Sequence, residues 1–153
     1  MRRKIQDVRK IAEKELGFAH VDNGFAETSF RKSSALTYYI YIIEDRIVGL
    51  LATENITRAF VATEAGHSIS SGKAHKASLG IHLMWVHAKH RKQGIATKLL
   101  DFARDRCVFG YTSIPPSRVA FSSPTESGFC FARSYMAKHE TPVLVYQFSF
   151  ENE

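Results

Sequence analysis

The sequence predicts one α/β domain over residues 1–153, built on a mixed β-sheet, and three observations support this prediction. The chain has 153 residues, which is enough for one domain with a substantial core but few for two. Hydrophobic residues make up 44% of it and charged residues 24%, as in an ordinary globular protein. Its apolar patterns follow the order helix, hairpin, strand, helix, strand, helix, strand, which is typical of an α/β fold.

The first half of the chain predicts a helix and a β-hairpin. Residues 4–18 carry apolar side chains at helical spacing, and we expect Gly17 to terminate this helix. Residues 35–44 and 46–56 are rich in β-branched and aromatic residues and meet at Asp45-Arg46, as the two strands of a hairpin do. Residues 58–63 predict a further short strand. Residues 64–78 are small and polar, and we expect one long surface loop there, near the substrate entrance.

The second half predicts strands and helices in alternation. Residues 79–87 are apolar on both faces, which indicates a central strand. Residues 94–109 predict a helix with a stripe formed by Ile95, Leu99, Ala103 and Cys107. The pair Pro115-Pro116 then precedes a strand over residues 117–123, a helix over 127–139 and a closing strand over 142–150.

The charge balance favours an anionic partner. Twenty-one basic residues against fifteen acidic ones give a net charge of +6 and a pI near 9.4. A phosphate-bearing cofactor, nucleic acid and an acidic protein surface all fit this balance. There is no signal-peptide pattern and no apolar run of about 20 residues, so we expect no membrane span.

The cysteine count also bounds the function. Two cysteines cannot form a zinc site by themselves, and we expect Cys107 and Cys130 to be buried free thiols in helices. Free thiols are weak evidence for a reducing, intracellular compartment.

A basic strand-to-helix junction is the first functional candidate. Residues 91–96 read R-x-x-G-x-A, directly after the central strand and at the start of a helix. The first turn of a helix has N–H donors without intrahelical partners, and its dipole favours an anion there. Gly94 and Ala96 leave this backbone accessible to a pyrophosphate. A helix start whose basic residues only face water is the alternative, and the usual nucleotide-binding motifs are missing.

Several motifs together resemble one known family. Residues 45–56 contain V-G-x-L-x-A/T-E-x-I, residues 79–101 contain G-I-x-x-x-W-V and the loop, and residues 119–135 contain F-S-x-P-T-x-x-G-x-x-F-A-x-x-Y. With the leading helix and the final VLVYQF, they resemble the cohesin acetyltransferase (establishment-of-cohesion) family of the GCN5-related N-acetyltransferase superfamily. The resemblance implies that superfamily's fold, a mixed and mostly antiparallel sheet with splayed central strands and flanking helices.

The resemblance implies acetyl-coenzyme A as the cosubstrate, with no metal. Backbone N–H groups around residues 84–86 would meet the acetyl carbonyl, the loop would hold the pyrophosphate, and one helix would wall the pantetheine channel. The residues concerned are Met84, Trp85, Val86, Arg91, Lys92, Gln93, Gly94, Ile95, Ala96, Thr97, Phe131 and Ala132.

The general base is open among several residues. The central strand has no glutamate, and its titratable residues are His82 and His87. Histidine can serve as a general base near neutral pH, because the unperturbed pKa of this residue type is about 6.5. The family's acidic positions correspond to Asp101, which periodicity places on the solvent side of its helix, and to Ser123, which cannot act as a base without a partner. A plain surface or packing role is the alternative for each histidine.

The resemblance suggests roles for two further residues. Tyr135 would protonate the coenzyme thiolate, with packing on Phe131 as the alternative. Glu54 would contact the substrate, with a surface charge on an edge strand as the alternative.

The expected function is acetylation of a lysine on the cohesin SMC subunit, which promotes sister-chromatid cohesion. A small-amine acetyltransferase and a weakly active module that binds cohesin or DNA are the alternatives. We expect a nuclear, chromatin-associated protein with at most non-specific nucleic-acid contact. The family usually carries a C2H2 zinc finger before this domain, and N-terminal regions that would contact the replication machinery. The sequence contains neither, which leaves open an excised core or a natural loss.

Overall fold

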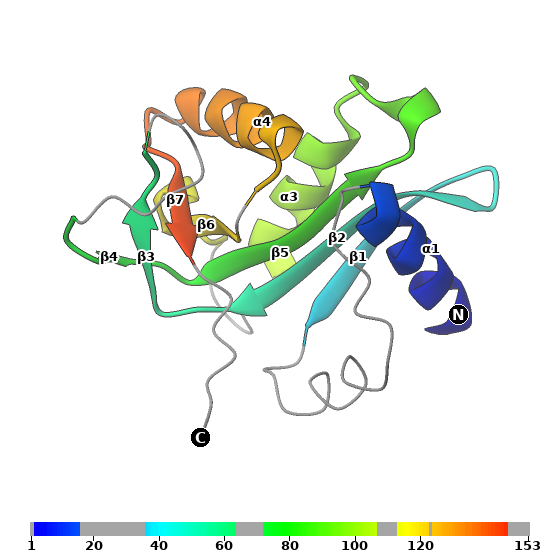
Figure 1. Ribbon diagram of the computed structural model, residues 1–153, viewed down its shortest axis with the longest axis horizontal. Helices are drawn as coiled ribbons and strands as arrows, with labels where there is room; N and C mark the ends of the chain where they lie inside the picture. The colour runs from blue at the N-terminus through cyan, green and yellow to red at the C-terminus, as the bar shows by residue number, and fades with distance from the viewer. Residues whose placement is uncertain (1, 16–35, 64–71, 107–112, 123, 147–153) are drawn as a thin grey trace.

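The sheet is the frame of the molecule. A computed structural model describes residues 2–15, 36–63, 72–106, 113–122 and 124–146. Within these residues seven strands form one sheet in the order β1-β2-β5-β6-β7-β3-β4, flanked by helices (Figure 1). The strands are β1 (Thr37–Ile43), β2 (Arg46–Asn55), β3 (Arg58–Val61), β4 (His75–Lys76), β5 (Leu79–Val86), β6 (Val119–Ser122) and β7 (Leu144–Tyr146). The helices are α1 (Arg2–Glu15), α3 (Ile95–Arg106) and α4 (Glu126–Ala137), with 3-10 turns η1 (Ala88–His90) and η2 (Pro116–Arg118).

The predicted hairpin is confirmed as β1 and β2. They pair antiparallel from Thr37↔Thr53 to Ile43↔Arg46. Glu44 and Asp45 between them have φ values of 46° and 60°, the left-handed conformation that a tight two-residue hairpin needs. The hairpin places β2 between β1 and β5, where its residues Val48 to Glu54 are buried.

The central strand β5 has a different neighbour on each side. It pairs antiparallel with β2 from Asn55↔Leu79 to Gly49↔Val86, but parallel with β6 only at Leu79, Gly80 and Ile81. Beyond Ile81 the ladder between β5 and β6 ends. The fold class implied by the resemblance, a mixed sheet with splayed central strands, is confirmed.

A β-bulge marks the point where the two strands separate. Thr53 pairs with Ile81 and Ala52 pairs with Leu83, so His82 is an extra residue of β5. The extra residue reverses the alternation of the strand. Ile81 belongs to the core beneath α3, whereas Leu83 belongs to the core beneath α1.

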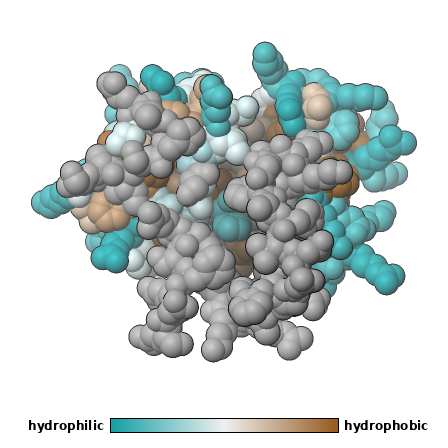
Figure 2. Space-filling model, in the orientation of Figure 1, coloured by the Kyte–Doolittle hydropathy of each residue, from teal (hydrophilic) through white to brown (hydrophobic). Residues whose placement is uncertain are grey.

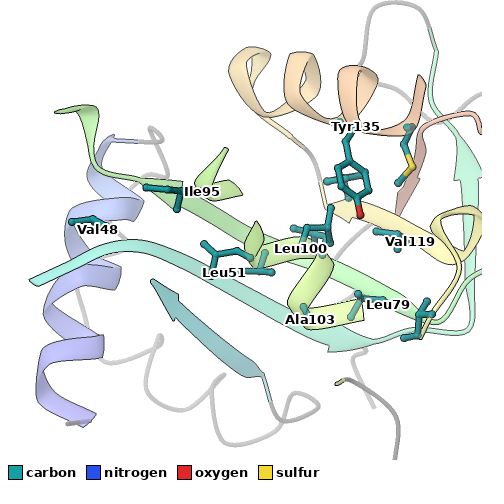
Figure 3. Close-up of a cluster of buried hydrophobic side chains, with 14 residues drawn as sticks. Val48, Leu51, Leu79, Ile95, Leu100, Ala103, Val119 and Tyr135 are labelled. Carbon is teal, nitrogen blue, oxygen red and sulfur yellow. The ribbon is translucent and has the colours of Figure 1, made fainter. Parts of the chain in front are cut away.

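Apolar side chains cover both faces of the sheet. The larger cluster lies between the sheet and α3 and α4 and contains Leu51, Leu100, Val119 and Tyr135 (Figure 3). The smaller cluster lies on the face covered by α1 and contains Ala12, Leu50, Ala52, Leu83 and Trp85. Figure 1 shows α1 and α3 on opposite sides of β2 and β5. No helix in the described ranges is long and apolar enough to cross a membrane.

Three predictions about these elements need correction. Residues 72–78 are not all loop, because His75 and Lys76 form β4 and pair with β3, while 64–71 lie outside the described residues. The helix after the basic loop begins at Ile95 rather than Gly94, and residues 107–109 lie outside the described part. Cys130 is exposed rather than buried, because the buried face of α4 carries Ala132, Tyr135 and Met136.

Candidate active site

A narrow pocket lies where β5 and β6 separate. Its lining comprises residues 81–84 of β5, Phe121 and Ser122 of β6, and Pro124, Thr125, Gly128 and Phe131 at the start of α4. The cavity volume is about 50 Å³, which is room for a few water molecules. Because the β5–β6 ladder has ended here, the backbone of β5 faces a space rather than a neighbouring strand. Such a slot suits a slender chain whose carbonyl needs N–H donors.

The four central-strand residues predicted for the site have different surroundings. His82 and Met84 line the pocket, and the Nδ1 atom of His82 is buried. Trp85 packs in the cluster beneath α1, and Val86 packs against the cluster beneath α3. Neither Trp85 nor Val86 is among the residues that line the pocket. His87 lies past the strand, where its Nδ1 accepts a hydrogen bond from the Lys89 N–H at 3.3 Å.

The basic loop leads from β5 into α3 through two left-handed residues. Lys92 has a φ of 59° and Gly94 a φ of 80°. Arg91 ties the loop back to β5, because its Nε donates to the Val86 carbonyl at 2.9 Å. A Cβ added at Gly94 would meet no atom within 4 Å, so the space above the helix start is open.

The first turn of α3 is packed against the core on one side and is accessible to solvent on the other. Ile95 is 3% exposed and fixes the turn to the core, while Ala96 and Thr97 are partly exposed. The N–H groups of this turn have no intrahelical partners, and Arg91, Lys92 and Gln93 are exposed beside them. In Figure 2 hydrophilic side chains project at the upper right, at the end of the molecule where β5 ends in Figure 1. This geometry is that of an anion site at a helix N-terminus.

The start of α4 completes the pocket. The Thr125 side chain accepts a hydrogen bond from the Gly128 N–H at 3.2 Å and caps the helix. Phe131, predicted for the pantetheine channel, lines the pocket. Ala132 does not; it is fully buried in the core beneath α3. Ser123, just before this helix, lies outside the described residues.

Asp101 and Tyr135 are brought together by α3 and α4. The Tyr135 hydroxyl donates to Asp101 Oδ1 at 2.5 Å, although the Asp101 side chain is 51% exposed as periodicity predicted. Arg104, which the sequence reasoning missed, donates from Nη1 to the Tyr135 oxygen at 2.8 Å and from Nε to the Ile114 carbonyl at 2.7 Å. The i,i+3 spacing of Asp101 and Arg104 was its only signal in the sequence.

The Tyr135 phenol is strongly perturbed. Burial and, after it, the hydrogen bond to Asp101 raise the pKa of Tyr135 to about 12, against the opposing effect of Arg104. The ring packs against Phe131 with centroids 5.8 Å apart, so the predicted packing contact is present. Neither Tyr135 nor Asp101 lines the pocket.

Glu54 is buried, and its strand is not an edge strand. β2 lies between β1 and β5, and Glu54 is 8% exposed. Its Oε1 accepts a hydrogen bond from the Tyr146 hydroxyl at 2.6 Å. Burial and this hydrogen bond raise the pKa of Tyr146 well above its ordinary value. Tyr146, 92 residues away in sequence, was not predicted for the site.

The described residues contain no group of three or more His, Cys, Asp or Glu side chains arranged to hold a metal ion.

Comparisons with known proteins identify the family of the chain. Residues 5–110 match the acetyltransferase (GNAT) family, and residues 75–146 match the ESCO1/2 acetyl-transferase family. N-acetyltransferase ESCO2 of Danio rerio is 34% identical over 163 residues, which cover 95% of this chain and 25% of that protein. N-acetyltransferase ECO1 of Kluyveromyces lactis is 31% identical, over 91% of this chain and 53% of that protein. The chain thus spans about half or less of the length of these relatives.

Solved structures lead to the same family. The xEco2 acetyltransferase domain bound to a K105-CoA conjugate superposes with a TM-score of 0.77 at 28% identity, over 96% of this chain and 85% of that one. An aminoglycoside N-acetyltransferase with a TM-score of 0.55 is only 12% identical and shares the fold alone. The chain therefore belongs to the acetyltransferase (GNAT) family, as an acetyltransferase domain of the ESCO1/2, or cohesin acetyltransferase, type.

Proposed function

We propose that this chain transfers the acetyl group of acetyl-coenzyme A to a lysine of the cohesin SMC subunit and so promotes sister-chromatid cohesion. One observation carries the proposal. In a chain of the ESCO1/2 type, β5 forms one wall of the pocket, and the chain continues from β5 through η1 and the basic loop to the anion site at the start of α3. A coenzyme with a phosphate end and a slender thioester end needs these two features together.

The residues present fit such a coenzyme. The turn of residues 94–97 would bind the pyrophosphate, because a side chain at Gly94 is absent and the helix dipole favours negative charge. Arg91, Lys92 and Gln93 would add polar contacts at this end. Backbone N–H groups of residues 84–86 would donate to the acetyl oxygen, beginning at Met84, which lines the pocket, and Phe131 would wall the channel.

The assignment of acid and base is also a proposal. His82 borders the pocket, and Asp101, which accepts a hydrogen bond from Tyr135 outside the pocket, matches an acidic position of the family, so each is a candidate for taking the proton of the amine. Ser123 and Tyr135 are carried over from the family's motif. The expected setting is the nucleus, at chromatin, with the cohesin subunit as the protein partner.

Mass spectrometry tests the proposal directly. The purified chain is incubated with acetyl-coenzyme A and a cohesin SMC head fragment, and in parallel with polyamines and aminoglycosides. We expect acetyl-lysine on the cohesin fragment and little product from the small amines. Product from small amines alone would contradict the proposed substrate.

Two variants of one residue test the cofactor loop. Gly94→Ala adds a Cβ into open space and costs about 1 kcal/mol of backbone strain. Gly94→Glu carries the same strain but puts a carboxylate where the pyrophosphate would bind. We expect similar melting temperatures for the two variants and a loss of acetyl-coenzyme A affinity of about 10-fold or more, measured by calorimetry, for Gly94→Glu only. Unchanged affinity in Gly94→Glu would remove the loop from the site.

A further inference from the structure

A row of side chains crosses the sheet from β7 to β2 beside the pocket. In the strand ladders Glu54 pairs with Gly80, Gly80 with Ala120, and Ser122 with Tyr146. Tyr146 reaches from β7 across β6 and β5 to Glu54 on β2. Small residues at Gly80 and Ala120 make this crossing possible.

Gly80 shows how closely the ring lies against the sheet. A Cβ added at Gly80 would be 2.7 Å from both Cζ and Oη of Tyr146. The ring therefore occupies the space that a side chain of β5 would otherwise fill, and Tyr146 is 6% exposed. The structure thus fixes the position of the phenol oxygen by packing as well as by its hydrogen bond to Glu54.

The hydrogen bonds of this row all run in one direction. The Tyr146 hydroxyl donates to Glu54 Oε1 at 2.6 Å, so its oxygen is left to accept. The Ser122 hydroxyl, which lines the pocket, hydrogen-bonds to that phenol oxygen. Because a carboxylate only accepts, the order of donors is Ser122 to Tyr146 to Glu54.

We propose that Ser122, Tyr146 and Glu54 form a proton wire that carries the proton of the substrate amine from the pocket to the Glu54 carboxylate. This inference rests on the proposed acetyltransferase function and names the proton acceptor that the central strand, without a glutamate, does not supply.

The step balances in atoms and charge. The ammonium group gives a proton to Ser122 Oγ, the Ser122 proton moves to Tyr146 Oη, and the Tyr146 proton moves to Glu54. The free amine attacks the thioester carbon, the C–S bond breaks, and the second nitrogen proton leaves with the sulfur as thiol. Glu54 finally returns its proton to water. Tyr146 passes the proton on without ionising, which agrees with its raised pKa.

One other titratable residue could take the same proton. His82 is the single titratable side chain among the described residues that line the pocket. It extends from β5, next to the strand that carries Glu54. A test of the wire must therefore separate Glu54 from His82, and also from a purely structural link between β2 and β7.

Three substitutions interrupt the wire at different places. Glu54→Gln keeps the shape of the side chain and an acceptor for Tyr146 but removes the carboxylate. Tyr146→Phe keeps the ring over Gly80 but removes the hydroxyl, and Ser122→Ala removes the hydroxyl at the pocket end of the wire. The matched control is Asp45→Asn, which removes an exposed carboxylate in the hairpin turn, where asparagine tolerates the positive φ. Melting temperature and acetyl-coenzyme A affinity are measured for every variant before the kinetics.

We expect each wire variant to lose about 100-fold in kcat at pH 7, as for loss of a general base. The loss should shrink as the pH approaches about 10, where lysine supplies free amine by itself. The double variant Glu54→Gln/Tyr146→Phe should be no slower than either single one, because the groups act as a unit. Asp45→Asn should match the wild type.

The outcomes separate the two proposals. A wild-type chain that acetylates none of the amines contradicts the proposed function and the wire with it. If the wild type is active, Glu54→Gln keeps full activity and only His82→Ala loses it, the result contradicts the wire but not the proposed function. A loss of kcat that is the same at every pH, or that is proportional to the loss in melting temperature, would show that the row has a structural role and would overturn the wire.

Discussion

At the scale of single residues, Asp101 shows that a contact with a neighbouring helix can give a surface position of a helix a specific hydrogen-bond partner. Its side chain is half exposed, as the apolar stripe of α3 requires, yet one of its oxygens accepts a hydrogen bond from the Tyr135 hydroxyl. The contact joins residues 34 apart in the chain, so helical periodicity has no means of detecting it. Arg104 holds both partners and the chain near Ile114. The three side chains couple α3 to α4 above the core.

The coupling predicts a specific dependence of stability on pH. The pKa of Tyr135 is raised from 10.0 to about 12, chiefly by burial and then by Asp101. Between these values the unfolded chain has lost the phenol proton while the folded chain keeps it. The contribution of the proton to stability is therefore complete below pH 10 and is lost as the pH rises toward 12.

Urea unfolding at fixed pH values measures this effect. From pH 9 to 12 the free energy of unfolding of the wild type should fall more steeply than that of Tyr135→Phe. At neutral pH the variant should be less stable, because it leaves Arg104 and Asp101 without the hydroxyl. Parallel curves for the two proteins would show that the phenol does not keep its proton over this interval.

At the scale of elements, the start of α4 explains which structural roles the described residues of the F-S-x-P-T motif have. The motif runs from β6 into the helix, with Ser122 at the pocket, Pro124 before the helix and Thr125 as its N-cap. Gly128 follows in the first turn, where its N–H donates to Thr125. The same short stretch therefore ends a strand, starts a helix and lines the pocket.

The cap predicts a loss in stability and in binding together. Thr125→Ala removes the acceptor for the Gly128 N–H and should lower the free energy of unfolding by about 1 kcal/mol. Affinity for acetyl-coenzyme A should also fall, because Thr125, Gly128 and Phe131 shape the pocket. Thermal unfolding and calorimetry measure the two effects. Thr125→Ser is the control, since it keeps the oxygen; if it behaves like Thr125→Ala, the hydroxyl is not the cause.

At the scale of the whole molecule, the sequence was informative where the interactions are local. The hairpin, the central strand and the open glycine at the start of α3 depend on neighbouring residues, and all of them were predicted. The bulge at His82 was not, because a strand that is apolar on both faces hides a change in alternation. The link between Tyr146 and Glu54 joins residues 92 apart and depends on the strand order. No periodicity within one segment could have indicated it.

The two apolar layers on one sheet predict how the molecule responds to the loss of α1. Ala12 is fully buried in the cluster that contains Trp85, the single tryptophan of the chain, whereas the neighbouring Ile11 is 50% exposed. Ala12→Glu places an unpaired charge in an apolar layer, which costs several kcal/mol unless α1 leaves the sheet. Either response should lower the melting temperature, and detachment should shift the Trp85 emission to longer wavelength. Ile11→Glu puts the same charge one residue away and should change neither measurement. If Ala12→Glu keeps the wild-type emission and melting temperature, α1 does not cover Trp85.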